Sequence, residues 1–317
     1  YLKRSSNWKN LWRNDMECDG VRGFIMPRSA NGEWLDELPF GHSVLNKPTY
    51  TYTTTMFEGP WYTKWWSSFF YEASSWEYSL SVPHDVPGLI AACGGKDSFE
   101  RRLDRFFEGG YYNVNNEPSF LSPCLYHWID KPEKTSTRVR QIISDHFSDR
   151  PDGIPGNDDS GAMSSWLAFH MLGLYPVAGD TTYVIHAPVL RESEITLPEG
   201  RKLKIVAKGM QGDNLAVSSI RLNGKPHPSH FLTHNELMNG GLLVLTLKEA
   251  TPAAKAGEAP VCQLAKGGAA AITDTLLFSY KLHGQTRRFT VWYDMPGDSL
   301  RMNWTIERNL KLWRGSY

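Results

Sequence analysis

Apolar residues recur at helical spacing through most of the first 190 positions. In residues 97–110, Phe99, Leu103 and Phe106 lie three or four positions apart, and the segment closes at Gly109-Gly110. This spacing with a glycine stop predicts a helix. The same pattern predicts helices within residues 83–95, 135–148 and 160–176.

Local signals set the expected ends of these helices. Pro87 suits the first turn of a short helix over Val86–Ala92, because proline is favoured at that end. Hydroxyl residues from Thr135 onward are fit to cap the next helix. Tyr175-Pro176 should stop the last one, since proline cannot continue a helix.

The period changes after about residue 183. Apolar and polar residues alternate over 193–209, 217–228 and 240–250, with further expected strands over 272–282, 285–295 and 300–307. Asn223-Gly224 is a strong hairpin-turn signal. Residues 250–270 are rich in Ala, Gly and Pro and predict a linker or exposed loop. We therefore expect a helical region over 1–185 and a β-strand-rich region over 186–317.

Composition narrows the possible functions. The 34 basic and 34 acidic residues balance, which argues against nucleic acid as a partner. A net charge of zero does not reveal a local basic patch. No apolar run approaches the ~20 residues of a membrane span. The 12 Trp, 14 Tyr and 14 Phe suit either helix-rich cores or sugar-binding clefts. Four cysteines show no CxxC spacing, which argues against a zinc site. The sequon Asn303-Trp304-Thr305 is typical of proteins that pass through the secretory route.

Asp158 and Asp159 are adjacent carboxylates just before the helix pattern at 160–176. One aspartate there is explained by helix capping, worth about 1 kcal/mol. A second neighbouring carboxylate needs a partner of its own, such as a cation, a water or a sugar hydroxyl. Spacing by itself favours a cap with a solvated neighbour over a catalytic site.

Two other segments carry candidate chemistry. Glu72 is a surface carboxylate on the simplest reading, but Phe69–Tyr71 and Trp76 flank it and would raise its pKa, as a general acid requires. Asn116-Glu117, in "NNEPS", fits a turn, or a set of hard oxygen ligands for calcium. For His84-Asp85, we favour a hydrogen-bonded structural pair over a metal ligand.

Five blocks of the sequence, in order, resemble glycoside hydrolase family 92, the calcium-dependent exo-acting α-mannosidases. The blocks are "GFIMPRSANGEW", "EASSWEYSLSVPHDVPGLIAACGGKDSF", "NNEPSFLSPCLY", "PDGIPGNDDSGAMSSWLAFHMLGLYPV" and "LNGKPHPSHFLTHNELMNGG". They cover roughly residues 20–245. The resemblance implies part of an (α/α)6 helical toroid, followed by a β-rich, sandwich-type C-terminal region.

The resemblance also implies an inverting mechanism on terminal α-mannosides of N-glycans or mannans. Glu72 falls on the general acid, and Asp158 or Asp159 on the general base. The family's Ca²⁺ binds the mannose 2- and 3-hydroxyls, and Asn116 and Glu117 are its implied protein ligands. Substrate contacts are expected from Trp34, Trp76, His84, Asp85 and Asn157. Glu58, in "FEGPWY", mimics the acid motif, but its Trp comes one residue too early.

Three positions depart from the family pattern. Ala73 stands where relatives carry glycine, Ala162 where they carry Gln, and Phe120 where His is frequent. Family members are also about twice as long, so we expect an N-terminal half, in another chain or segment, as a partner besides the mannose-containing glycan. A secreted, secretory or vacuolar location is expected. The alternative is a non-catalytic family member that binds glycans or serves as a structural subunit.

Overall fold

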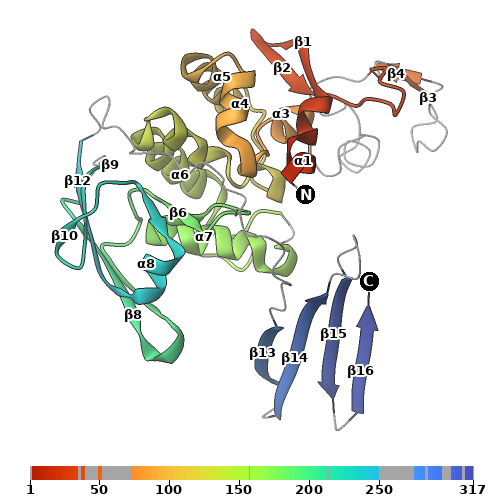
Figure 1. The fold of residues 1–317 in the computed structure, drawn as a ribbon. Helices are drawn as coiled ribbons and strands as arrows, with labels where there is room; N and C mark the ends of the chain where they lie inside the picture. Colours follow the sequence, from red (N-terminus) through yellow and green to blue (C-terminus); the bar gives the residue numbers. More distant parts are fainter. Residues whose placement is uncertain are drawn as a thin grey trace. The chain divides into compact units, whose positions relative to one another are not determined.

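The computed structural model describes residues 2–34, 37–39, 49–51, 73–156, 158–212, 215–249, 275–282, 285–294, 301–308 and 311–316. The chain divides into two compact units, Tyr1–Cys262 and Gln263–Tyr317. The first unit contains the described helices and several sheets, and the second contains one sheet (Figure 1). The coarse prediction of helices followed by strands is confirmed, whereas the toroid and the boundary near residue 185 stay predictions. The expected linker around 250–270 lies outside the described residues.

The helical segment matches the predicted spacing. Its α-helices are α1 (Leu2–Ser5), α3 (Ser75–Tyr78), α4 (Val86–Ala92), α5 (Lys96–Glu108), α6 (Pro132–His146) and α7 (Ala162–Leu172). Short 3₁₀ helices are η1 (Ser6–Leu11), η2 (Pro83–Asp85), η3 (Glu117–Ser119), η4 (Ser122–Ile129) and η5 (Asp159–Gly161). Helices α4 and α5 form where the sequence predicts them, with Gly109 capping α5.

Two predicted helix ends are wrong. Helix α6 begins at Pro132 and not at the hydroxyl residues, because the fixed φ of proline suits the first helical position. Helix α7 ends at Leu172, since Gly173 adopts a left-handed φ of 77° and closes it. The next three residues, Leu174–Pro176, form strand β5.

A β-hairpin lies near the N-terminus, where helices and loops were expected. Strands β1 (Trp12–Cys18) and β2 (Val21–Ile25) pair antiparallel. Their turn residues, Asp19 and Gly20, have φ of 54° and 77°. An Asp-Gly pair is favoured in such turns, so the signal was present in the sequence. Strands β3 (Glu37–Pro39) and β4 (Thr49–Thr51) form a second antiparallel pair.

The helical segment packs around a core rich in aromatic side chains. Trp76 is 0% exposed and stacks on Tyr111 with ring centroids 4.4 Å apart. The edge contact between Phe24 and Trp76, at 4.9 Å, joins strand β2 to helix α3. This packing fixes α3, a helix too short to be stable by itself.

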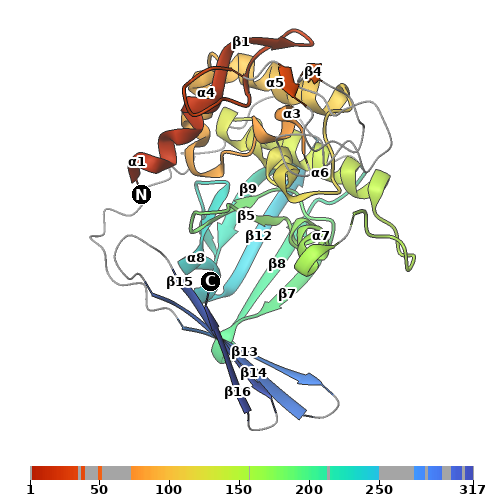
Figure 2. The ribbon, with the colours of Figure 1, turned by 90° about the vertical axis from the view of Figure 1, so that its right-hand side faces the viewer.

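The remaining strands of the first unit form two sheets. One contains β7 (Glu192–Thr196), β8 (Lys202–Lys208), β9 (Ala216–Leu222), β10 (Lys225–Pro226) and β12 (Gly241–Lys248) in the order β10-β9-β12-β8-β7. Figure 2 shows four of these strands, β9, β12, β8 and β7, side by side. The other contains β5, β6 (Thr182–Ile185) and β11 (Phe231–Thr233) in the order β11-β6-β5. The 3₁₀ helix η6 (Pro198–Gly200) and helix α8 (His234–Asn239) connect strands.

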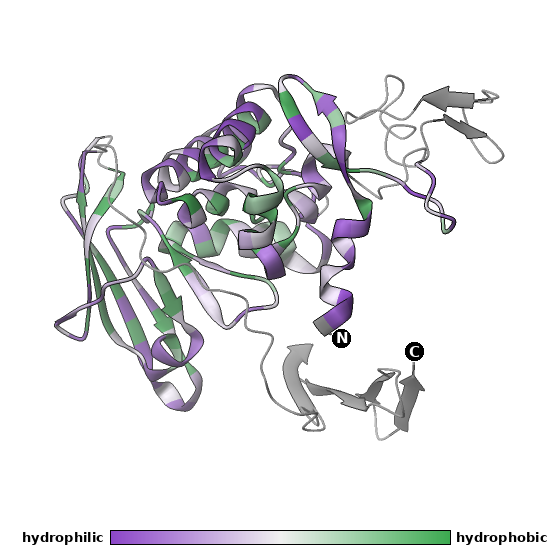
Figure 3. Cartoon of the chain, turned by 45° about the horizontal axis from the view of Figure 1, so that its top comes forward, coloured by the Kyte–Doolittle hydropathy of each residue, from purple (hydrophilic) through white to green (hydrophobic). Residues whose placement is uncertain are grey.

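These two sheets share one hydrophobic core. Ile185 and Leu232 from the smaller sheet pack in the same cluster as Ile205 and Leu245 from the larger one. Hydrophobic and hydrophilic residues alternate along the larger sheet, as Figure 3 shows, and strands β8 and β12 each bury one face. The hairpin predicted at Asn223-Gly224 is confirmed, with both residues at positive φ between β9 and β10.

The second unit is an antiparallel sheet in sequence order. Its strands are β13 (Thr275–Leu282), β14 (Gln285–Asp294), β15 (Arg301–Arg308) and β16 (Lys311–Ser316). The first three confirm the strands expected over 272–282, 285–295 and 300–307. Strand β16 was not predicted.

Four buried histidines join the helical segment to the smaller sheet. His127 of η4 contacts Thr135 Oγ1 and the Ile185 carbonyl oxygen, both at 2.9 Å. His170 Nδ1 lies 2.9 Å from His186 Nε2. The rings of His127 and His230 are in edge-to-face contact. Burial lowers the pKa of each of these imidazoles, to about 4 for His186.

We expect acid to destabilise this junction. The unfolded chain binds a proton at His186 below pH 6.5, while the folded chain stays neutral there until about pH 4. The stability is therefore complete above pH 6.5 and falls as the pH drops through this window, by about 3 kcal/mol for His186. Urea unfolding of wild type and His186→Asn between pH 7.5 and 4.5 measures it.

The test reads the slope of unfolding free energy against pH, not its absolute value. His186→Asn should flatten that slope by the uptake of about one proton. His146→Asn is the matched control, because it removes an imidazole that is exposed to solvent. Equal slopes for wild type and His186→Asn would contradict the prediction.

Candidate active site

Two predicted site residues, Glu72 and Asn157, lie outside the described residues. The segments next to them are described. Helix α3 begins three residues after Glu72, and Asp158 follows Asn157 directly. The geometry of the site is therefore built from α3, η3 and the turn that leads into α7.

Helix α3 is fixed at both ends. At its start, Glu77 Oε2 accepts a hydrogen bond of 2.7 Å from the Ser74 backbone N–H, which completes a capping box. At its end, Ser79 Oγ accepts a 2.8 Å bond from the Ile25 N–H of strand β2. Ser75 Oγ donates to the Ile25 carbonyl oxygen. Trp76 was predicted as a substrate contact, but its side chain points into the core. Packing of the core explains why a tryptophan stands at this position.

The "NNEPS" segment forms the short helix η3 and not a simple turn. Asn116 is 4% exposed and stands at the N-cap position, and Glu117 is the first residue of the helix, with its side chain exposed. Ser119 Oγ donates a 2.8 Å hydrogen bond to Glu77 Oε1. The segment that carries the predicted metal ligands is thereby attached to α3.

The turn before α7 passes directly against this segment. Gly156 has a φ of 72°, and a Cβ placed on it would lie 2.4 Å from the Asn115 carbonyl oxygen. Only glycine tolerates both the conformation and the close approach. Trp166 Nε1 donates a 3.1 Å bond to the Phe120 carbonyl oxygen and holds α7 to the end of η3. Two sequence blocks about 40 residues apart thus meet backbone to backbone.

The two aspartates of this turn differ in their surroundings. Asp158 Oδ1 accepts a 2.9 Å bond from the Ser164 N–H, and Oδ2 accepts a 2.7 Å bond from Ser164 Oγ. The bonds from Ser164 lower the pKa of the Asp158 carboxyl group. Gly161 stands at the N-cap position of α7, and the Asp158 carboxylate caps the helix from further back, through the third helical residue, Ser164. This fits the expectation that one of the two aspartates serves the start of the helix. Asp159 begins η5, and its side chain is exposed.

His84 and Asp85 serve local structure, but with separate partners. His84 Nε2 lies 2.8 Å from the Ser5 carbonyl oxygen. Asp85 caps α4 through a 3.0 Å bond from the Gly88 N–H and also accepts a 3.2 Å bond from Trp8 Nε1. These contacts favour the structural interpretation over a metal ligand. The expected His84–Asp85 bond is replaced by these bonds to other segments.

Trp34 lies partly exposed beside two arginines. The Arg28 guanidinium is 4.7 Å from its ring centroid and that of Arg13 is 5.5 Å away. Arg28 also donates to the carbonyl oxygens of Gly32 and Asn10, which fixes the loop after β2. Trp34 is therefore held by cation–π contacts with Arg28 of its own block and with Arg13 of strand β1.

The donor chemistry around η3 fits calcium in part. Asn116 and Glu117 supply an amide and a carboxylate, which are hard oxygen donors, whereas calcium takes about 6–8 oxygens. Among the described residues, no group of three or more His, Cys, Asp or Glu side chains is close enough to hold a metal. Backbone carbonyls, water and substrate hydroxyls would have to complete such a site.

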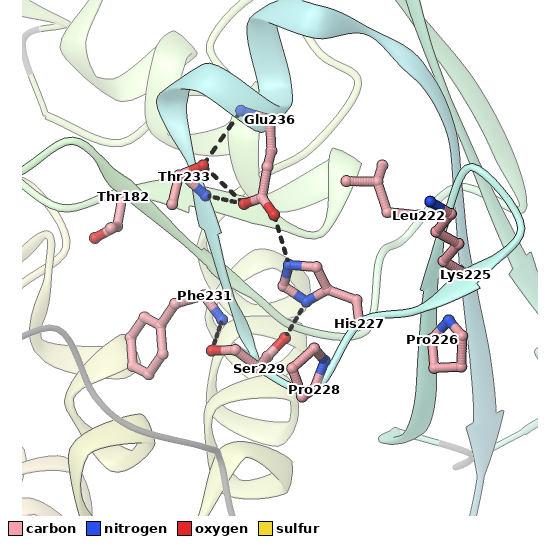
Figure 4. Close-up of a pocket in the computed structure, with 10 residues that line it drawn as sticks. All are labelled: Thr182, Leu222, Lys225, Pro226, His227, Pro228, Ser229, Phe231, Thr233 and Glu236. Atoms are coloured by element: carbon pink, nitrogen blue, oxygen red, sulfur yellow. Dashed lines mark hydrogen bonds and ion pairs between the residues drawn. The ribbon is translucent and has the colours of Figure 1, made fainter.

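A separate cleft of about 530 Å³ lies at the β9–β10 hairpin and helix α8 (Figure 4). It is lined by Thr182, Leu222, Lys225, Pro226, His227, Pro228, Ser229, Phe231, Thr233 and Glu236. His227 bridges the Ser229 carbonyl oxygen, at 2.8 Å, and Glu236 Oε1, at 3.3 Å. Glu236 Oε2 accepts the bonds of a capping box from Thr233. Sequence reasoning missed this cleft, and no predicted site residue lines it.

Among the residues that the structure describes, no helix is both long and apolar enough to cross a bilayer.

Comparison with known proteins gives a consistent picture. The profile of the Glycosyl hydrolase family 92 catalytic domain matches residues 1–249. An "Uncharacterized secreted glycosidase" of Arthroderma benhamiae is 34% identical over 256 residues, which is 78% of this chain and 32% of that protein. The chain thus spans about a third of that relative's length, less than the half expected from the family resemblance.

Solved structures of the same family are similar in fold. A family GH92 α-mannosidase from Bacteroides thetaiotaomicron, in complex with mannoimidazole, is 25% identical with a TM-score of 0.65 over 78% of this chain and 32% of its own. A family GH92 inverting mannosidase from the same organism is 26% identical, with a TM-score of 0.63 over 79% of this chain and 33% of its own.

Proposed function

Because the chain belongs to glycoside hydrolase family 92, we propose that it supplies part of an exo-acting α-mannosidase. The enzyme would hydrolyse terminal α-mannosides of N-glycans or mannans with inversion at the anomeric carbon. The observation that carries this proposal is the meeting of three segments: α3 is bonded to η3 through Glu77 and Ser119, and Gly156 packs against Asn115. Two of these are the segments of the proposed base and metal ligands, and the third directly follows the proposed acid.

We assign the carboxyl groups separate roles. Glu72 is the proposed general acid, which protonates the glycosidic oxygen. Asp159 is the proposed general base, which takes a proton from the attacking water, because the Asp158 carboxylate is already engaged in capping α7. An inverting enzyme holds its two carboxyl groups about 6.5–9.5 Å apart to admit that water. The cap at Asp158 supports this assignment by fixing the backbone at Asp159.

Asn116 and Glu117 are the proposed protein ligands of Ca²⁺. When bound, calcium would accept the mannose 2- and 3-hydroxyl oxygens and help distort the ring. The exposed Glu117 carboxylate at the start of η3 supports a role toward a ligand. The contact of Gly156 with Asn115 supports a position next to the proposed base. Substrate contacts from Trp34, His84, Asp85 and Asn157 stay predictions.

We further propose that a segment corresponding to the rest of the family fold completes the active site. The chain spans about a third of the secreted relative and of the solved mannosidases that it matches. A completing segment would cover the exposed Asp159 and Glu117. Secretion, or a place in the secretory or vacuolar pathway, is proposed from the relative described as secreted.

Mannose release tests this function. The chain, with its completing segment, should release mannose from a terminal α-mannoside, and proton NMR should show the β-anomer first. EDTA should remove the activity and added calcium should restore it, because the donor set is built of hard oxygens. Magnesium serves as the control, since it demands a smaller and more regular oxygen shell. Activity that chelation leaves unchanged would contradict the calcium proposal, and release of the α-anomer would contradict inversion.

One observation favours a second function, glycan binding without catalysis. Phe120, where His is frequent in the resembling family, is 9% exposed and packs in the aromatic core. It presents no imidazole beside η3. A chain that binds mannose oligosaccharides by calorimetry, but releases no mannose when complete, would support this second function.

A further inference from the structure

Glu77 is a buried carboxyl group that is not the proposed acid, the proposed base or a proposed metal ligand. It is 1% exposed and belongs to helix α3. Its Oε2 accepts a 2.7 Å hydrogen bond from the Ser74 N–H, and its Oε1 accepts one of 2.8 Å from Ser119 Oγ. Burial raises the pKa of Glu77, although these bonds oppose the rise.

The two partners of Glu77 lie on segments that are far apart in the sequence. Ser74 comes two residues after Glu72, and Ser119 comes two residues after Glu117. One carboxyl group therefore connects the segment that follows the proposed acid with the segment that carries the proposed metal ligands.

Neither segment can hold its own position. Helix α3 has four residues and η3 has three, and helices of that length are unstable without tertiary contacts. Helix α3 has a second attachment, because Ser75 and Ser79 bond to Ile25 of strand β2. The bond from Ser119 to Glu77 attaches η3 to α3. Removing it leaves a buried polar group without its partner, so the two segments are coupled through Glu77.

We propose that Glu77 is a positioning residue that fixes η3 at a set distance from the start of α3. The coupling of α3 to η3 through Glu77 does not depend on the function of the chain. The effect of Glu77 on hydrolysis rests on the proposed mannosidase function. A shift of about 1 Å in such a site lowers turnover by about a hundredfold.

Hydrogen–deuterium exchange of the full chain tests the structural part. Glu77→Ala should raise exchange in peptides over both 73–79 and 116–121, by about tenfold for the loss of a buried hydrogen bond. Glu77→Gln should restore the wild-type rates, because its amide oxygen accepts from Ser74 while its NH₂ donates to Ser119 Oγ. Ser119→Ala removes only the bond between Glu77 and η3, and it replaces Glu77→Ala in the test if Glu77→Ala does not fold.

Ser79→Ala is the matched control. It removes another fully buried hydrogen bond of α3, but one that leads to Ile25 and not to η3. It should raise exchange around α3 and leave residues 116–121 unchanged. Unchanged exchange at 116–121 in both Glu77→Ala and Ser119→Ala would overturn the proposal.

Turnover tests the catalytic part in the preparation that releases mannose. Glu77→Ala should lower kcat about a hundredfold with a smaller change in KM, and Glu77→Gln should recover most of it. Full kcat in Glu77→Ala, together with faster exchange, would overturn the positioning role. If the wild-type protein releases no mannose, the proposed function fails, while the exchange result still decides whether Glu77 couples the segments.

Discussion

Asp159→Asn is expected to lower kcat/KM for α-mannoside hydrolysis by about a thousandfold while leaving the thermal stability close to wild type. The isosteric amide keeps the shape of the side chain but cannot take a proton from water. The side chain of Asp159 is exposed, so no buried contact is lost. Initial rates on an aryl α-mannoside and a Tm measurement provide the test.

Asp158→Asn is the matched control for this prediction. Its amide oxygen can accept from the Ser164 N–H while its NH₂ donates to Ser164 Oγ, and asparagine tolerates the left-handed φ of 50° at this position. The charged cap is the stronger one, so the Tm should fall while kcat/KM stays within about tenfold of wild type. The reverse result, with activity lost in Asp158→Asn and kept in Asp159→Asn, would assign the base to Asp158.

The sequence predicted the regular helices well because their signals are local. Spacing and a glycine or proline placed α4 and α5. The end of α7 was misplaced because two stop signals compete, and Gly173 acts before Pro176. The hairpin of β1 and β2 was missed although Asp19-Gly20 is a turn signal, because its strands do not alternate strictly and a bulge shifts their register.

The candidate site was harder to predict, because its geometry depends on contacts between distant residues. Adjacent carboxylates indicated that one aspartate caps a helix, but only the bonds from Ser164 identify Asp158 as that one. The spacing of Ser74 and Glu77 matches a capping box, but nothing in the sequence indicated the bond of Glu77 to Ser119, 42 positions away. The close approach of Gly156 to Asn115 was likewise invisible, because glycine is common in loops for many reasons.

The second large effect is expected at the proposed acid. Glu72→Gln should lower kcat/KM by about a thousandfold on mannosides with a poor leaving group, because the amide cannot protonate the glycosidic oxygen. An activated aryl mannoside, whose leaving group departs without protonation, should lose far less activity. This dependence on the leaving group separates the acid from the base, since loss of the base in Asp159→Asn affects both substrates alike.

Glu58→Gln is the control for that experiment. Glu58 stands in "FEGPWY", which imitates the acid motif, but no "VPHDVPGL" follows it at the spacing found after Glu72. It should therefore keep wild-type activity on both substrates. The residues that follow Glu72 support Glu72 over Glu58 as the acid, because Ala73 is buried and Ser74 and Glu77 form the capping box of α3. Full hydrolysis of both mannosides by Glu72→Gln would remove Glu72 from the mechanism and leave glycan binding as the better explanation of the chain.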